Sequence, residues 1–83
     1  MPTIHVRLFA GLHQMIGTRE IDIGLREGAT VDGLYAAIAE AHPQVEALLR
    51  ATVCAIDEDY VPRTHALHDG DRVALIPPVS GGA

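Results

Sequence analysis

Aliphatic and polar residues alternate along the first stretch of the chain, residues 3–10. The aliphatic side chains that fall on one face are Ile4, Val6 and Leu8. Alternation with a period of two predicts a strand whose aliphatic face is turned inward. Phe9 falls on the opposite face, so we expect a large aromatic side chain on the outside of this strand.

A second stretch, residues 19–25, alternates in the same way through Ile21 and Ile23. Two successive strands of this kind predict an antiparallel hairpin. The connection between them contains residues 12–16, which are bracketed by glycines. Because this segment is short, we expect no more than a helical turn within a wide connection.

The period of the apolar residues becomes helical after Thr30, with Val31, Leu34, Tyr35, Ile38 and Ala41 on one face. Thr30 suits the N-cap, and Asp32 in the first turn favours the helix dipole. Pro43 ends this helix at about His42. We expect a further helical turn over residues 44–50, whose core-facing side chains are Val45, Leu48 and Leu49.

Short apolar runs separated by turns make up the rest of the chain. We expect a strand at residues 53–56, an acidic turn at 57–59, and an extended path through Tyr60 that stops at Pro62. A His-Asp-Gly-Asp turn at 68–71 leads into a last strand at 72–76. In that strand Val73 and Leu75 share one face, and Ala74 and Ile76 share the other.

This order of elements predicts the fold class. One main helix packed on one face of a mixed sheet is the layered solution for a chain of 83 residues. The order is that of the α+β arrangement known as the β-grasp, or ubiquitin-like, fold. We expect the domain to span residues 1–78. Pro77 and Pro78 cannot donate to a sheet ladder, so we expect residues 79–83 to form a flexible tail.

The β-grasp fold carries an implication for three residues. In that fold the first and last strands lie side by side, parallel, at the centre of the sheet. Phe9 and Ile76 would then be neighbours on the exposed face, and Tyr60 would extend the patch. An exposed apolar patch beside a free tail predicts a docking surface. The alternative is that Phe9 and Ile76 belong to the core beneath a loop.

Composition and charge exclude several classes of partner. The net charge of −5 argues against nucleic acid and against anionic membrane surfaces, and it favours a basic protein partner. All six cationic side chains are Arg, so no side-chain amine can accept an isopeptide bond. We find no apolar run long enough to span a membrane and no signal-peptide pattern, and we expect a cytoplasmic protein.

Three further residues or groups invite a chemical interpretation. The single cysteine, Cys54, could relay sulfur, but its place in a strand is typical of a small buried hydrophobe. His65 and His68 lie near Asp69 and Asp71, yet the spacing does not supply a complete set of metal ligands. The acidic turn at 57–59 either selects a basic partner or is simply solvated, and its spacing does not fit a calcium loop.

Several stretches resemble one family closely. They are residues 6–10, 16–18, 29–31 and, most specifically, 67–82, where Asp-Gly-Asp precedes an apolar strand and then Pro-Pro-Val-Ser-Gly-Gly. The chain resembles, over nearly its whole length, the small sulfur-carrier subunit of molybdopterin synthase, a ubiquitin-like family. The resemblance implies a protein that is not an enzyme by itself but is the sulfur donor of a sulfurtransferase complex.

The resemblance also implies a mechanism. An adenylating partner similar to ubiquitin-activating enzymes uses ATP to activate the terminal glycine, here Gly82, and a persulfide then supplies sulfur. The resulting thiocarboxylate enters the large subunit of the synthase and gives its sulfur to a pterin precursor. Val79, Ser80 and Gly81 would thread the partner's site. The residues implied to bind the partner are Phe9, Tyr60, Ile76, Pro77 and Pro78, and the carrier itself would bind no metal or cofactor.

Ala83 departs from the family, whose members usually end at the second glycine. One extra residue displaces the carboxylate by up to ~3.6 Å. A peptidase could trim it, it could be foreign to the natural protein, or the tail could belong to a paralogue that is never activated. The alternatives for function are a sulfur carrier for cysteine or thiamin synthesis, a ubiquitin-like protein modifier, and a binding module without chemistry.

Overall fold

The computed structural model describes residues 1–78. The expected tail at 79–83 therefore lies outside the described residues. The elements in chain order are β1 (Thr3–Leu8), α1 (Ala10–Ile16), β2 (Glu20–Gly24), α2 (Val31–Ala41), a 3₁₀ turn η1 (Pro43–Val45), α3 (Glu46–Leu49), β3 (Val53–Ile56), β4 (Asp59–Val61) and β5 (Arg72–Ile76). No helix among residues 1–78 has both the length and the apolar character needed to cross a bilayer.

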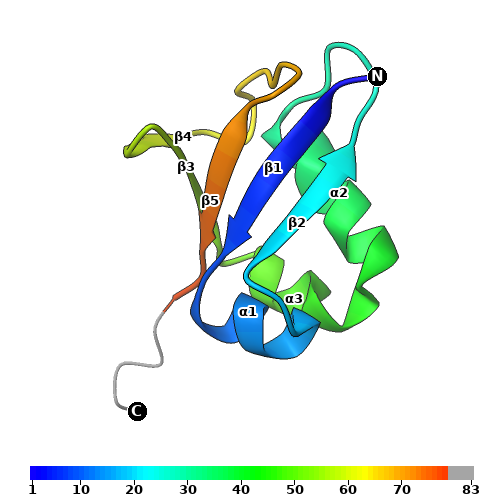
Figure 1. Ribbon diagram of the computed structural model, residues 1–83. Coiled ribbons are helices and arrows are strands. Elements are labelled where there is room, and N and C mark those ends of the chain that lie inside the picture. Colours follow the sequence, from blue (N-terminus) through cyan, green and yellow to red (C-terminus); the bar gives the residue numbers. More distant parts are fainter. Residues whose placement is uncertain (79–83) are drawn as a thin grey trace.

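The strands form a single mixed sheet in the order β2-β1-β5-β3-β4. The central strands β1 and β5 run parallel, and every other neighbouring pair is antiparallel. Figure 1 shows the helices gathered on one side of the sheet. The predicted β-grasp fold is therefore confirmed, including the central parallel pair that the strand pattern alone could not establish.

The core lies between the sheet and α2, and the two predicted periods account for it. Ile4, Val6 and Leu8 are buried, as are Val73 and Leu75 of the parallel neighbour. On α2 the buried side chains are Val31, Leu34, Tyr35 and Ile38. Ala41 is exposed, contrary to the helical pattern. It is the last residue of α2, and the chain turns away at His42 and Pro43.

The connection between β1 and β2 is more helical than expected. The seven-residue helix α1 occupies it and buries Leu12 completely. Gly11 suggested a loop, but it lies within the helix. A Cβ at Gly11 would come within 3.0 Å of the Leu48 Cδ2 atom. The glycine therefore allows α1 to pack closely against the segment after α2, which is a tertiary requirement.

The Asp-Gly-Asp turn joins the start of β1 to the start of β5. The Thr3 N–H donates to Asp69 Oδ1 at 2.7 Å, and the Gly70 N–H donates to the Thr3 carbonyl oxygen at 2.9 Å. The His5 N–H donates to the Asp71 carbonyl oxygen at 2.9 Å. Gly70 has φ of 86°, a value that favours glycine. The family-like motif at 69–71 is thus a clamp that sets the register of the parallel pair.

A buried polar contact ties α2 to the segment before β3. The Tyr35 hydroxyl donates to the Thr52 carbonyl oxygen at 2.8 Å. Burial raises the pKa of Tyr35 to about 12, and the nearby Cys54 thiol adds to the rise while Arg63 opposes it. The Arg63 guanidinium lies 4.6 Å from the ring centroid and donates to the Leu49 carbonyl oxygen at 3.1 Å. Tyr35 therefore stays neutral across the physiological range.

We expect Asp69→Ala to destabilise the domain by about 1–2 kcal/mol, because the Thr3 N–H loses its side-chain acceptor. The midpoint of thermal unfolding should fall by roughly 4–16 °C. Asp69→Asn keeps a side-chain oxygen and should lose less. If Asp69→Ala unfolds at the same temperature as the wild type, the clamp does not stabilise the fold.

We expect the free energy of unfolding to fall at high pH because of Tyr35. The folded-state pKa of about 12 lies above the ordinary tyrosine value of 10.0, so this stabilisation is complete below pH ~10 and is lost as the pH rises toward ~12. Urea titrations at pH 8 and pH 11 measure the difference. Tyr35→Phe should reduce the pH dependence, with a remainder from Cys54, and should cost about 1 kcal/mol at pH 8 because the Thr52 carbonyl loses its donor.

Candidate functional site

The face of the sheet away from the helices changes from charged to apolar along the strands. One cross-strand row contains Asp22, His5 and Arg72. The next row runs through Glu20, Arg7, Ala74, Ala55 and Tyr60. At the end where β5 finishes, Ile76 pairs with Val53. The apolar end of this face is therefore the end from which the chain leaves the sheet.

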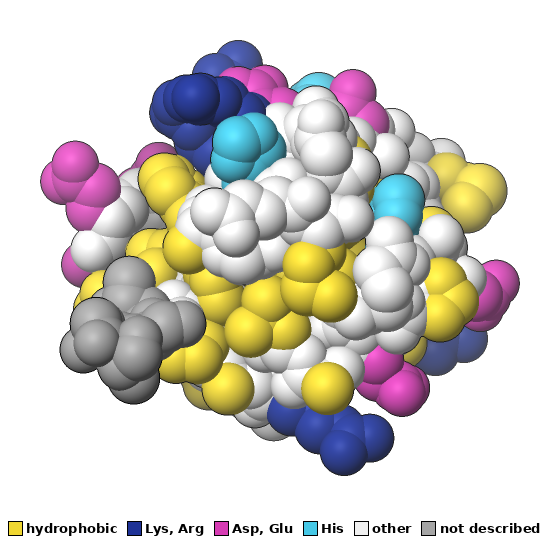
Figure 2. All heavy atoms as spheres, turned by 90° about the horizontal axis from the view of Figure 1, so that it is seen from below, with side chains coloured by type: hydrophobic (Ala, Val, Ile, Leu, Met, Phe, Trp, Pro, Cys, Tyr) yellow, Lys and Arg dark blue, Asp and Glu magenta, His cyan; other side chains and the backbone are white. Residues whose placement is uncertain are grey.

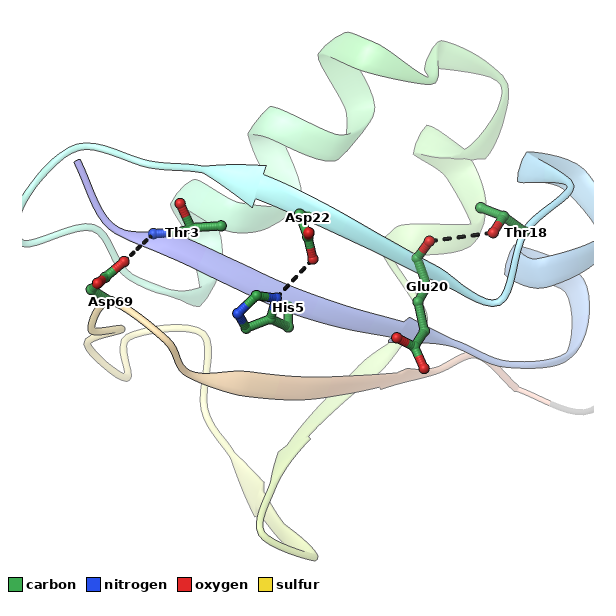
Figure 3. Close-up of polar contacts among 6 residues, drawn as sticks. All are labelled: Thr3, His5, Thr18, Glu20, Asp22 and Asp69. Atoms are coloured by element: carbon green, nitrogen blue, oxygen red, sulfur yellow. Dashed lines mark hydrogen bonds and ion pairs between the residues drawn. The ribbon is translucent and has the colours of Figure 1, made fainter.

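A hollow of about 490 Å³ lies on this face. Ala74 and Ala55 contribute small side chains to it, and Phe9, Ile76 and Tyr60 contribute large ones. Phe9 is 40% exposed and Tyr60 is 73% exposed. Figure 3 shows the β3–β4 hairpin on the opposite side of the central strands from the helices, so the hairpin forms a wall. The arrangement is suited to receiving a large apolar group.

The end of the described chain lies beside apolar surface. Figure 2, which views the molecule from below, shows hydrophobic side chains gathered on this face. Ile76 lines the hollow and Pro78 is exposed, whereas Pro77 is buried. Pro77 therefore anchors the end of β5 inside the domain and does not present its ring at the surface.

The structure brings together three residues singled out from the sequence, since Phe9, Tyr60 and Ile76 all line the one hollow. Neither Phe9 nor Tyr60 is covered by a loop. Their role in binding a partner stays a prediction. The expected threading residues Val79, Ser80 and Gly81, and the expected reactive residue Gly82, lie outside the described residues.

Three residues of this surface were missed in the sequence. Val53 is 46% exposed and pairs with Ile76. Ala55 and Ala74 pair with each other and line the hollow between its larger residues. The sequence feature that could have revealed them was the small side chain of Ala74, at an outward position of the last strand. It has meaning only once the register places it opposite Ala55.

Charged groups surround the hollow. Arg7 lies 5.9 Å from the centroid of the Phe9 ring. His5 Nδ1 lies 2.8 Å from Asp22 Oδ1. Glu20, Asp57, Glu58 and Arg72 also line the hollow. The surface therefore combines an apolar centre with charges of both signs, which is the usual composition of a protein-binding patch with a polar rim.

The structure gives the other groups singled out in the sequence a structural explanation. Cys54 is 2% exposed, and burial raises its pKa to about 11, so a thiolate is disfavoured. His65 and His68 are exposed. Within residues 1–78 no group of three or more His, Cys, Asp or Glu side chains could hold a metal ion. Asp71 has a structural task instead, because its Oδ2 accepts the His68 N–H at 2.8 Å.

Comparison with known proteins identifies relatives along nearly the entire chain. Residues 6–82 match the model of the ThiS family. A molybdopterin synthase sulfur carrier subunit from Chlamydomonas reinhardtii is 41% identical, with 95% of this chain and 98% of that protein covered. The crystal structure of SAMP1 from Haloferax volcanii superposes with a TM-score of 0.86 at 28% identity, covering 96% and 99% of the two chains.

A structure of a complex is also similar. In the protein–protein complex of subunits 1 and 2 of molybdopterin-converting factor from Helicobacter pylori, the matching chain is 25% identical. The TM-score is 0.67, and the alignment covers 96% of this chain and 99% of that chain.

We expect Cys54 to react with a disulfide reagent about 100-fold more slowly in the folded domain than in urea, because the thiol is buried and its pKa is raised. The release of the chromophore measures both rates. The control is Tyr60→Cys in a Cys54→Ala background, which places a thiol at a position that is 73% exposed. Equal rates for Cys54 with and without urea would mean that the thiol is accessible and could handle sulfur.

Proposed function

The chain belongs to the ThiS family, and from that premise we propose that it is the sulfur-carrying small subunit of a molybdopterin synthase. The sulfur is carried as a thiocarboxylate on Gly82 and is given to a pterin precursor in the large subunit. The 41% identity to a carrier subunit over nearly the full length of both chains supports this role. We place the protein in the cytoplasm, since its single cysteine cannot form an internal disulfide.

The proposed adenylation and sulfur transfer require few chemical groups from the folded domain. A carboxylate oxygen of Gly82 attacks the α-phosphorus of ATP bound to an adenylating partner, and pyrophosphate leaves. The terminal sulfur of a persulfide then displaces AMP from the carbonyl carbon. Two electrons from a thiol break the sulfur–sulfur bond and release the thiocarboxylate. The carrier binds no cofactor in this scheme, and it supplies no acid or base.

The domain contributes placement, and the position of Ile76 is the observation on which the proposal rests. Ile76 ends β5, lines the hollow and is followed by the buried Pro77. A partner that covers the hollow therefore holds the point from which the tail departs. Tethering raises the effective concentration of the reactive end, and orientation lowers the barrier further. The Helicobacter complex of two subunits supports a large subunit as that partner.

A terminal alanine cannot present Gly82 as an acyl group. We therefore propose that a peptidase removes Ala83 before activation. Because the chain contains no lysine, the activated terminus meets no side-chain amine within its own domain. The start of β1 and the end of β5 lie at opposite ends of the central parallel pair.

A second candidate function is supported by specific similarities. The Haloferax volcanii small archaeal modifier protein 1 is 31% identical over 92% of this chain. A modifier would use the same activated Gly82, but a lysine amine on a target would displace AMP in place of sulfur. Carriers for cysteine or thiamin synthesis would share the thiocarboxylate and differ only in the acceptor.

Intact mass measured on protein isolated from its own host tests the proposal. We expect a chain that ends at Gly82 and is ~16 Da heavier than the free acid, because sulfur replaces one oxygen. Deletion of Gly82 should abolish molybdopterin synthesis and leave the thermal unfolding midpoint unchanged. Isopeptide-linked conjugates on other proteins would favour the modifier, and a full-length chain that the host's activating enzyme never adenylates would contradict both functions.

A further inference from the structure

The two-residue turn between β3 and β4 places acidic side chains at the wall of the hollow. Asp57 and Glu58 form this turn and line the hollow, and Asp59 begins β4. Tyr60 follows directly and is 73% exposed. The hairpin therefore presents carboxylates and a large aromatic ring to whatever enters the hollow.

The carboxylates of this turn have no cationic partner in the described part of the chain. Its ion pairs join His5 to Asp22, Arg63 to Asp32 and His68 to Asp71. Asp57, Glu58 and Asp59 take part in none of them. Arg7 belongs to β1 and lies over Phe9, whereas Arg72 begins β5, the neighbour of β3, and lines the same hollow without forming an ion pair with the turn. Negative charge thus remains unneutralised on the hairpin side of the hollow.

The backbone of the turn shows that Glu58 is not the residue that the fold prefers at its position. Asp57 has φ of 51° and Glu58 has φ of 70°. A two-residue hairpin turn with both residues at positive φ favours Asn-Gly, and a side chain such as that of Glu is strained there. Glu58 therefore carries a carboxylate at a position where glycine would be more stable.

We propose that the hollow and the acidic turn together recognise a protein segment in which a lysine or arginine stands beside a large apolar side chain. The apolar side chain occupies the hollow between Phe9, Ile76 and Tyr60, and the cation meets Asp57 and Glu58. The proposal rests on the proposed function, because it assigns this segment to the large synthase subunit. The net charge of −5 favours the approach of such a basic surface at longer range.

The separation of charges also sets the orientation of the segment. Arg7 belongs to β1, two strands away from β3, whereas the acidic turn follows β3 directly. A cationic side chain is repelled over the central strands and attracted at the hairpin. A segment that docks with the opposite polarity places its cation against the arginines, which costs binding energy. The turn therefore contributes specificity and association rate in addition to affinity.

The test compares binding of the full-length chain and its variants to the purified large subunit from the same host. Asp57→Asn combined with Glu58→Gly removes both charges and gives the turn its preferred sequence. We expect its thermal midpoint to rise by about 2–6 °C, because strain at positive φ is relieved. We expect its affinity for the large subunit to fall about 5-fold to 20-fold at low salt, mainly through slower association.

Two further variants serve as matched controls. Glu40→Gln combined with Glu46→Gln removes the same amount of charge from exposed positions on α2 and α3, on the helical side of the sheet, and should bind within about 2-fold of the wild type. Ile76→Asp introduces a charge into the hollow itself and should abolish measurable binding. In ~0.5 M salt the difference between the turn variant and the wild type should shrink, since the Debye length becomes shorter than ~5 Å.

The outcomes separate the two proposals. If the wild type binds, Ile76→Asp does not, and the turn variant binds like the wild type at low salt, the role of the acidic turn is overturned and the proposed function stands. An equal loss from the turn variant and the helix-side variant means a general effect of net charge, which also overturns it. If the wild type fails to bind the large subunit, the proposed function is wrong, and the assignment of the segment falls with it.

Discussion

The parallel pairing of β1 with β5 is the constraint on which the rest of the structure depends. Strands that lie at opposite ends of the chain are joined there, and the backbone turn at 69–71 closes the join through Asp69 and Gly70. The pairing places two rows of aliphatic side chains against α2. On the other face it brings the outward residues of both strands together, and it sets the direction in which the chain leaves the sheet.

The consequence for function is a division of labour between the domain and its terminus. Groups that could react are withdrawn: Cys54 is buried with a raised pKa, and Tyr35 is held neutral by burial. What the surface offers is shape, with small residues below a hollow and aromatic residues around it. A domain of this kind positions a reactive end. Under the proposed function, the partner that covers the hollow decides the reaction at that end, and carriers and modifiers can therefore share one fold.

The β3–β4 turn lowers the stability of the fold, and under the proposed inference the same turn recognises a partner segment. Positive φ at Asp57 and Glu58 opposes folding, and unpaired carboxylates on one hairpin repel each other. The two-residue turn requires positive φ, but it does not require the charges, because the strands on either side pair regularly up to Ile56 and Asp59. The central strand pair and the core beneath it stabilise the fold, so the fold tolerates this loss of stability at the edge of the sheet. The edge is also where a partner can approach.

The sequence by itself determined the local elements and much of the core, because the periods of two and of 3.6 are properties of single segments. Ile4, Val6 and Leu8 were identified in this way, as were the limits of α2 at Thr30 and Pro43. Only the tertiary structure decided what depends on register and close approach. Gly11 serves packing against Leu48, Pro77 is buried, and Val53, Ala55 and Ala74 lie on the face of the sheet that carries the hollow. Each of these depends on a neighbour distant in the chain, which no local pattern encodes.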